Sequence, residues 1–381
     1  MQTGKIIKLM YVANTRMPTE KAHGLQIMKM CEAFARQGAI VKLVVPWRFN
    51  PIKEDPFEYY GIEKNFKITK LPSLDLVKLG KIGFLIQSFS FAKCAFWYAL
   101  FRKADAVYSR DELPLFYISF LNLFALGGKN LFWESHDGRL NFFIKRVLLK
   151  CKEIVSISQG LKNFYVEKGI NPGKILVAPD GVDLKEFDIP ISKEEARKKL
   201  GLPLNKKITL YTGSFYLYDW KGIDVLLSAA KLFSNEYLFL LVGGNIEEIK
   251  KVKDKYKSEN ILLIGRRPHR DMPYYLKAAD VLVLPNKKSD EISEKYTSPL
   301  KLFEYMASGR PIIASDLPSI REILNTDNAI LVQSDDPQSL AEGINVALKN
   351  FKLADKISNK AFQDAGKYSW IERAKNILNF L

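Results

Sequence analysis

The chain has 381 residues, 47% of them hydrophobic, and a formal net charge of +16. This length favours two domains, and three scattered cysteines indicate reduced thiols, not a disulfide framework or a zinc site. The N-terminal apolar run is interrupted by Lys8 and does not fit a signal peptide, and we expect no segment that spans a membrane, which would need about 20 apolar residues.

The positive charge is uneven, because residues 1–50 contain eight Lys/Arg and two Asp/Glu. Such a surface suits an anionic partner: nucleic acid, phospholipid headgroups or a phosphorylated small molecule. A generally lysine-rich composition explains the same numbers without any partner. No helix-turn-helix, zinc or aromatic–basic motif is present, so we expect no nucleic acid partner.

The first half of the chain alternates short apolar runs with helical patterns. Residues 6–13 form an apolar run, residues 25–38 place apolar side chains at helical spacing, and residues 40–45 are apolar again. Strand, helix and strand in this order indicate a parallel βαβ unit. Further strands are predicted at 105–109, 130–135, 153–158 and 174–179.

The second half repeats this alternation, with strands predicted at 208–213, 237–244, 260–265, 280–286 and 311–316. The fold class is therefore α/β, with two doubly wound Rossmann-like domains. We place the domains at 1–185 and 206–366, with a charged linker at 186–205 and a last helix within 367–381. Ligands of such sheets bind at the carboxyl ends of the strands, so a central cleft between the domains is the expected site.

A helix is predicted at 299–308. Ser298 is a suitable N-cap, Pro299 fits the first helical position, and Gly309 is a natural stop.

The start of this helix is a candidate phosphate site. Leu300 and Lys301 would offer free backbone N–H groups, and Lys301 adds an ammonium group. Glu304 lies one turn further on, and its carboxylate could accept hydrogen bonds from two ribose hydroxyls. An ordinary solvated glutamate on an amphipathic helix is the simpler alternative.

Other candidate residues follow predicted strands. Gly213 and Ser214 allow a tight turn, and Lys221 could reach a diphosphate, although it could equally be a surface lysine. His136, one of three histidines, could bond a sugar hydroxyl or a phosphate, or have no role. Gly24 would allow the close approach of a ligand, or serve a simple turn.

Six segments together resemble the family 4 glycosyltransferases of the GT-B fold, over nearly the whole chain. They are RMPTEKAHGLQIMKMCEAFARQGAIVKLV, KILVAPDGVDLKEF, YTGSFYLYDWKGIDVLL, AADVLVLPN, SPLKLFEYMASGRPIIASDLPSIREIL and YSWIERAKNIL.

The resemblance implies retaining transfer of a sugar from a nucleotide diphosphate donor to a glycan or lipid-linked acceptor, in cell-surface polysaccharide or glycolipid synthesis. It implies no metal and no other cofactor, an acceptor-binding N-terminal domain, a donor-binding C-terminal domain, and a last helix that returns to the first domain. Residues 265–268 would line the base. The catalytic residues would be His136 and Lys221, and the donor-binding residues Gly24, Gly213, Ser214, Lys221, Arg266, Arg267, Ser298, Pro299, Leu300, Lys301 and Glu304.

Two departures from the family pattern are visible. The family often has a glutamate where this chain has Tyr296, and the nearest acid is Glu294. The family also often has an arginine in the loop before the residue that corresponds to Lys221, where this chain has none; Arg266 or Arg267 would have to compensate.

Two alternative functions stay open: a sugar-nucleotide epimerase of related fold, or a dinucleotide-dependent oxidoreductase. The oxidoreductase would need a Gly-x-Gly-x-x-Gly loop after a first strand, which neither half has.

Residues 78–103 are mostly apolar, with basic residues at both ends. They are interrupted by Gln87, Ser88, Ser90 and Lys93, so we expect either a buried helix or a helix partly exposed at an anionic membrane surface. The protein would then be cytoplasmic and peripheral at the inner face of the cell membrane.

Overall fold

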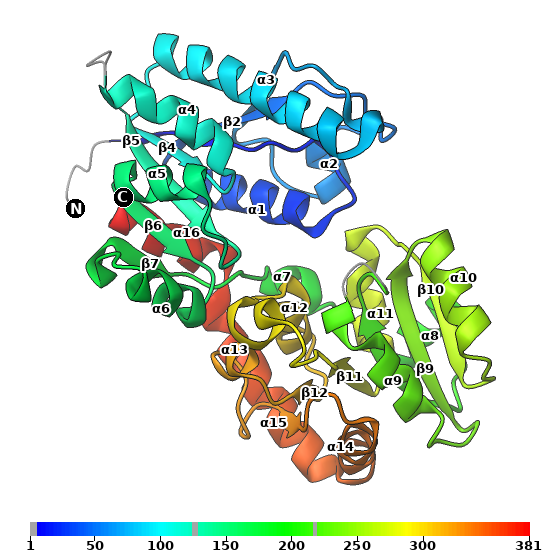
Figure 1. Cartoon of the computed structure of the whole chain (residues 1–381). Coiled ribbons are helices and arrows are strands. Elements are labelled where there is room, and N and C mark those ends of the chain that lie inside the picture. The colour runs from blue at the N-terminus through cyan, green and yellow to red at the C-terminus, as the bar shows by residue number, and fades with distance from the viewer. Residues whose placement is uncertain (1–5, 124–128, 216–218) are drawn as a thin grey trace. The chain divides into compact units, whose positions relative to one another are not determined.

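The computed structural model describes residues 6–123, 129–215 and 219–381. The chain divides into two compact units: unit 1 contains Met1–Pro179 and Trp370–Leu381, and unit 2 contains Asp180–Ser369. Each unit has a parallel sheet with helices on both faces (Figure 1). The predicted fold class, two doubly wound α/β domains, is confirmed.

Unit 1 contains a seven-stranded parallel sheet in the order β3-β2-β1-β4-β5-β6-β7. Its strands are β1 (Lys8–Val12), β2 (Ile40–Pro46), β3 (Lys67–Leu71), β4 (Ala106–Ser109), β5 (Asn130–Ser135), β6 (Glu153–Ser156) and β7 (Ile175–Val177). Its helices are α1 (Ala22–Arg36), α2 (Pro56–Tyr60), α3 (Gly80–Phe101), α4 (Glu112–Leu123), α5 (Phe142–Lys150), α6 (Gln159–Glu167) and α16 (Trp370–Phe380). Helix α4 packs between α3 and α5, whereas α1 packs with α2 and α16, so the C-terminal helix completes one helical layer of unit 1.

Unit 2 contains a six-stranded parallel sheet in the order β10-β9-β8-β11-β12-β13. Its strands are β8 (Lys207–Thr212), β9 (Tyr237–Gly244), β10 (Ile261–Gly265), β11 (Val281–Leu284), β12 (Ile312–Ser315) and β13 (Ile330–Val332). Its helices are α7 (Leu184–Phe187), α8 (Lys193–Leu200), α9 (Ile223–Ala230), α10 (Ile246–Lys255), α11 (Met272–Ala278), α12 (Leu300–Ala307), α13 (Pro318–Arg321), α14 (Pro337–Lys349) and α15 (Phe351–Ala365).

The strands of unit 2 read as continuous apolar runs because the two faces of the sheet each contribute to a core. In β9, Leu238, Leu240 and Val242 belong to one core, and the alternating Phe239 and Leu241 belong to the other. This is the two-residue period of a strand whose faces are both covered by helices.

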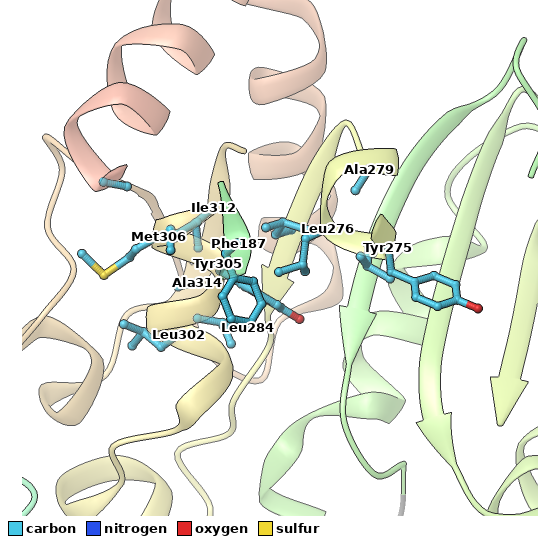
Figure 2. Packing of buried hydrophobic residues seen from close by; sticks show 14 of the residues in the cluster. Phe187, Tyr275, Leu276, Ala279, Leu284, Leu302, Tyr305, Met306, Ile312 and Ala314 are labelled. Atoms are coloured by element: carbon cyan, nitrogen blue, oxygen red, sulfur yellow. The ribbon is translucent and has the colours of Figure 1, made fainter. Parts of the chain in front are cut away.

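The first of these cores also contains the segment that we expected to be a linker. Figure 2 shows Phe187 of α7 beside Tyr305 and Met306 of α12, and Phe187 is 1% exposed. Ala196 of α8 is buried in the same core. Residues 186–205 are therefore part of unit 2, and burial of their apolar side chains, at about 1.5–3 kcal/mol for a side chain as large as Phe187, stabilises them there.

Helix α3 has both buried and solvent-exposed side chains. Its buried residues are Gly83, Gln87, Ser88, Phe91, Ala92, Ala95 and Ala99. Several large apolar side chains at its two ends are exposed, among them Ile82, Trp97 and Phe101. By length and composition the segment Val77–Phe101 could cross a membrane, which the sequence had not led us to expect, but this criterion is weak and is also met by core helices.

Candidate functional site

Each sheet has one point at which the connections turn in opposite directions. In unit 1, β1 lies between β2 and β4, and in unit 2, β8 lies between β9 and β11. Ligands of open parallel sheets bind at the carboxyl ends of the strands at such switch points. We therefore expect ligand-binding residues in the loops after β1, β4, β8 and β11.

The loop after β8 begins with a backbone conformation that favours glycine. Gly213 has φ of 131°, and its N–H donates to the Val242 carbonyl at 2.8 Å. The next residue, Ser214, accepts a hydrogen bond from Lys221 Nζ at 2.6 Å. Residues 216–218 of this predicted loop lie outside the described residues.

Two lysines approach the switch point of unit 2. Lys301 Nζ donates to the Thr212 carbonyl at 3.1 Å and lies 3.8 Å from the centre of the Tyr211 ring. Burial lowers the pKa of Lys221 to about 8, although Glu248 acts in the opposite direction. Burial and the charge of Lys221 also lower the pKa of Lys301 well below its usual value. Burial is the main cause of both shifts, and a bound anion would favour the protonated form of each lysine, so we regard the region as a candidate anion site.

Helix α12 presents its N-terminus at the same place. Its N-cap is Pro299, and among the described residues no side chain caps it and no acid lies in its first turn. We expected Ser298 to cap this helix, and that expectation is wrong: its hydroxyl accepts the Asp180 N–H at 3.1 Å. The backbone N–H groups of Leu300 and Lys301 thus remain available for a ligand.

Glu304 is buried on α12 and paired with a histidine that the sequence analysis missed. Its Oε1 lies 2.8 Å from His269 Nε2. His269 begins a short 3-10 turn (His269–Asp271) after β10, directly behind residues 265–268. That position, and the presence of only three histidines in the chain, could have marked it.

Unit 2 also contains the four residues named where this chain departs from the family pattern: Arg266, Arg267, Tyr296 and Glu294. Arg266 and Arg267 are exposed in the loop after β10, and the charge of Arg266 contributes to the lowered pKa of Lys221, after burial. Tyr296 is buried and its hydroxyl donates to Glu291 at 3.0 Å, whereas Glu294 is partly buried.

In unit 1, His136 follows β5 and contacts a fully buried carboxylate. His136 Nε2 lies 2.6 Å from Glu134 Oε1. Glu134 also accepts hydrogen bonds from Gln26 at 2.6 Å and from the Tyr108 hydroxyl. Side chains alternate between the two faces of β5, and this alternation points Glu134 toward Gln26 and Tyr108. The sequence analysis did not identify Glu134.

The positive partner of Glu134 comes from the far end of the chain. Burial would raise the pKa of Glu134, but Arg373 and His136 hold it well below its usual range. Arg373, on α16, lies 3.2 Å from Glu134 Oε1 and donates from Nε to the Pro179 carbonyl at 2.8 Å. A buried, hydrogen-bonded ion pair therefore holds the C-terminal helix in unit 1.

The approach of a ligand to Gly24 stays a prediction, and the close neighbours of this glycine in the structure are side chains of unit 1. A Cβ at this position would collide with the Tyr60 hydroxyl and with Thr19. The Tyr60 hydroxyl donates to the Thr19 carbonyl at 2.6 Å, so Gly24 leaves room for the contact that fixes the loop before α1.

Residues 192–364 match the sequence model of the family Glycosyl transferases group 1. The match covers less than half of the chain and makes this segment similar to that family. The group 1 segment contains every candidate donor-binding residue except Gly24, whereas Gly24 and His136 precede it.

Curated proteins with glycosyltransferase names are also similar to the chain. The chain is 27% identical over 238 residues to an uncharacterized glycosyltransferase of Methanocaldococcus jannaschii, covering 60% of the chain and 59% of the relative. It is 27% identical over 231 residues to a D-inositol 3-phosphate glycosyltransferase of Corynebacterium urealyticum, covering 56% and 52%. The chain thus spans about half the length of the curated relatives that it matches.

Solved structures share the fold over both units. Anabaena HepE, in complex with UDP and glucose, superposes with a TM-score of 0.75 at 16% identity, covering 98% of each chain. Sucrose-phosphate synthase from Thermosynechococcus elongatus superposes with a TM-score of 0.77 at 18% identity and the same coverage. The predicted GT-B fold is confirmed.

The buried pair in unit 1 leads to a prediction about stability. Arg373→Met should lower the free energy of unfolding of unit 1 by about 3–5 kcal/mol, because Glu134 is left buried without its counter-charge. The double variant Glu134→Gln/Arg373→Met should regain part of this loss. Urea unfolding, followed by the fluorescence of Trp133 and Trp370, measures both. An unchanged midpoint for Arg373→Met would show that the pair does not hold α16.

Proposed function

We propose that the chain is a retaining glycosyltransferase that moves a sugar from a nucleoside diphosphate sugar to a glycan or lipid-linked acceptor without a metal ion. Its role would lie in cell-surface polysaccharide or glycolipid synthesis. The group 1 match and the glycosyltransferase names of the relatives support transfer. HepE, which shares the fold, was solved with UDP and glucose, which supports the donor class.

The observation that carries the proposal is the positive charge collected at the switch point of unit 2. Lys221, Lys301 and the uncapped start of α12 all lie after β8 or β11. A leaving nucleoside diphosphate gains negative charge as the glycosidic bond breaks. Fixed ammonium groups and backbone N–H donors stabilise that charge most strongly in the transition state, which is the task that a divalent metal performs in other enzymes.

The remaining residues have proposed roles in orientation. Glu304 accepts hydrogen bonds from the ribose hydroxyls, with His269 holding its carboxylate in place. Gly213 and Ser214 bring backbone close to the diphosphate, and Arg266 adds charge in place of the arginine that the family often has. In unit 1, His136, oriented by Glu134, contacts the transferred sugar.

The lipid-linked acceptor is supported by one relative and by helix α3. A Campylobacter jejuni relative, 26% identical over 222 residues, is named as acting on a diphospho-undecaprenol-linked sugar; the match covers 57% of the chain and 56% of the relative. On α3 and the residue before it, Leu79, Ile82 and Leu85 are more than half exposed. Basic residues flank the segment and α3 has no acid, so an anionic membrane surface is its proposed partner. The group 1 match and the relatives' names give no support to an epimerase or an oxidoreductase.

The ribose role of Glu304 can be tested by binding. Glu304→Ala should raise the dissociation constant of the nucleotide sugar at least about tenfold, because charge-assisted hydrogen bonds contribute about 1.5–3 kcal/mol each. Glu342→Ala, an exposed acid on α14, is the matched control and should bind as the wild type does. Calorimetry that finds equal affinity in both variants would remove Glu304 from the site.

The lowered pKa of Lys221 predicts a pH dependence of donor binding. The diphosphate prefers the protonated ammonium, so affinity should be full below pH 8 and fall as the pH rises through about 8, by up to about tenfold per unit. Lys221→Arg should abolish this fall, because arginine stays protonated. Titrations in EDTA from pH 6.5 to 9.5 measure it, and a requirement for added metal would contradict the metal-free proposal.

Association with membranes should depend on charge and on the exposed residues of α3. The full chain should float with vesicles that contain phosphatidylglycerol at low salt and be released at high salt, since surface attraction is screened. Ile82→Asp should reduce flotation, whereas Ile246→Asp, at a still more exposed position in unit 2, should not. Protein that stays at the bottom of the gradient with every vesicle type would exclude a peripheral membrane enzyme.

A further inference from the structure

Unit 1 contains a cavity of about 370 Å³ at the carboxyl ends of its central strands. Its lining comes from the loops after β1, β2, β4 and β5, so it occupies the switch point between β1 and β4. Its charged and polar lining includes Lys21, Arg48, Arg110, Trp133 and His136. All of the lining residues belong to unit 1, whereas Lys221 and Lys301 belong to unit 2.

The cavity contains more positive charge than its carboxylates compensate. Arg110 is partly buried and donates to Gln26 at 3.1 Å, and within the described part of the chain neither it nor Lys21 forms an ion pair. Burial, followed by Arg110 and Lys21, lowers the pKa of His23 to about 3, which places both cations near that neutral ring.

The other arginines of the lining are paired with carboxylates, and Arg48 Nε lies 3.5 Å from Asp75 Oδ1. Arg139 pairs with Asp137 at 2.9 Å, and Asp111 accepts the Asn14 N–H at 2.7 Å. Arg16 pairs with Glu20, and Glu112 is the remaining acid. Arg110 and Lys21 are therefore the cations left for a ligand.

One further group offers a hydrogen-bond donor. The indole N–H of Trp133, which is 3% exposed, is buried without a hydrogen-bond partner among the described residues. Helix α1 starts at the cavity, and in the part of the chain that is described it has neither a side-chain cap nor an acid in its first turn. A buried donor with no acceptor and a helix N-terminus favour an anionic ligand.

We propose that this cavity binds a phosphate group of the acceptor, through Arg110 and Lys21 with a donor from Trp133. The inference rests on the proposed glycosyl transfer and specifies the acceptor as a phosphorylated molecule. The group is held in unit 1, apart from the donor's diphosphate in unit 2.

The geometry also connects this cavity with helix α3. Asn14, which lines the cavity, donates to Ser88 at 2.9 Å and accepts from Gln87 at 2.9 Å. Phe84, one turn earlier, lines the cavity and is 45% exposed. A phosphate in the cavity would thus have apolar surface beside it, as the phosphate of a lipid requires, while a soluble sugar phosphate offers the same charge.

The test measures binding of glycerol 3-phosphate, a soluble phosphomonoester, to the full chain by calorimetry. Arg110→Gln and Lys21→Gln should each weaken binding at least about tenfold, the loss expected for one charge-assisted contact. Lys150→Gln, an exposed lysine of α5, is the control and should not change it. Because Lys21 is exposed, its substitution tests the site even if Arg110→Gln lowers the melting temperature.

Two comparisons separate this inference from the proposed donor site. Lys221→Gln should lose nucleotide sugar binding and keep glycerol 3-phosphate binding, and Lys21→Gln should show the reverse. Loss of glycerol 3-phosphate in Lys221→Gln would place the phosphate in unit 2 and overturn the inference, as would wild-type affinity in both Arg110→Gln and Lys21→Gln.

Vesicles distinguish the source of the phosphate. If the ligand is a lipid phosphate, Lys21→Gln should weaken binding to vesicles with phosphatidic acid more than to vesicles with phosphatidylglycerol, since the former alone presents a phosphomonoester. Equal loss on both, with glycerol 3-phosphate binding still sensitive to Lys21, assigns the cavity to a soluble phosphate. Either result supports the phosphate site.

Discussion

A parallel sheet must be covered on both faces, and this constraint decides where chemistry can occur in the chain. A central strand contributes to two cores, as the alternation along β9 shows. Polar groups that are not needed for packing are therefore favoured at the strand ends, in the loops and the first turns of the helices that follow. In unit 2 Lys221, Lys301 and Glu304 lie in such positions, and in unit 1 similar segments line the cavity beyond β1 and β4.

Buried charged side chains have different surroundings in the two units. Glu134 is neutralised by Arg373 and satisfied by hydrogen bonds, so its pKa is held low and the cluster stabilises unit 1. Lys221 and Lys301 are also removed from water, but burial lowers their pKa values. A buried charge whose counter-charge holds its pKa in favour of the ionised form serves the fold, whereas buried lysines with lowered pKa values at a strand end are our candidates for binding an anion.

The sequence allowed the central strands and the predicted helix at Glu304 to be placed, because fully buried strands are continuous apolar runs with clear helical patterns between them. It did not indicate β3 or β13, which lie at sheet edges: β3 mixes polar with apolar residues, and β13 is only three residues long. Ser298 was misplaced as a cap, because its partner Asp180 lies 118 residues away. Long-range pairing also explains why Glu134 and His269 were missed: Arg373, Gln26 and Tyr108 reach Glu134 from distant segments, and His269 meets Glu304 across 35 residues.

The route of the chain through the two units has a consequence for biosynthesis. Unit 2 is one continuous segment, but unit 1 needs both the first 179 residues and Trp370–Leu381. On a ribosome the N-terminal half emerges first, and yet Glu134 cannot meet Arg373 until the last residues have been translated. Unit 2 can therefore complete its core before α16 is available to unit 1. The unit that is synthesised first is the last to be completed.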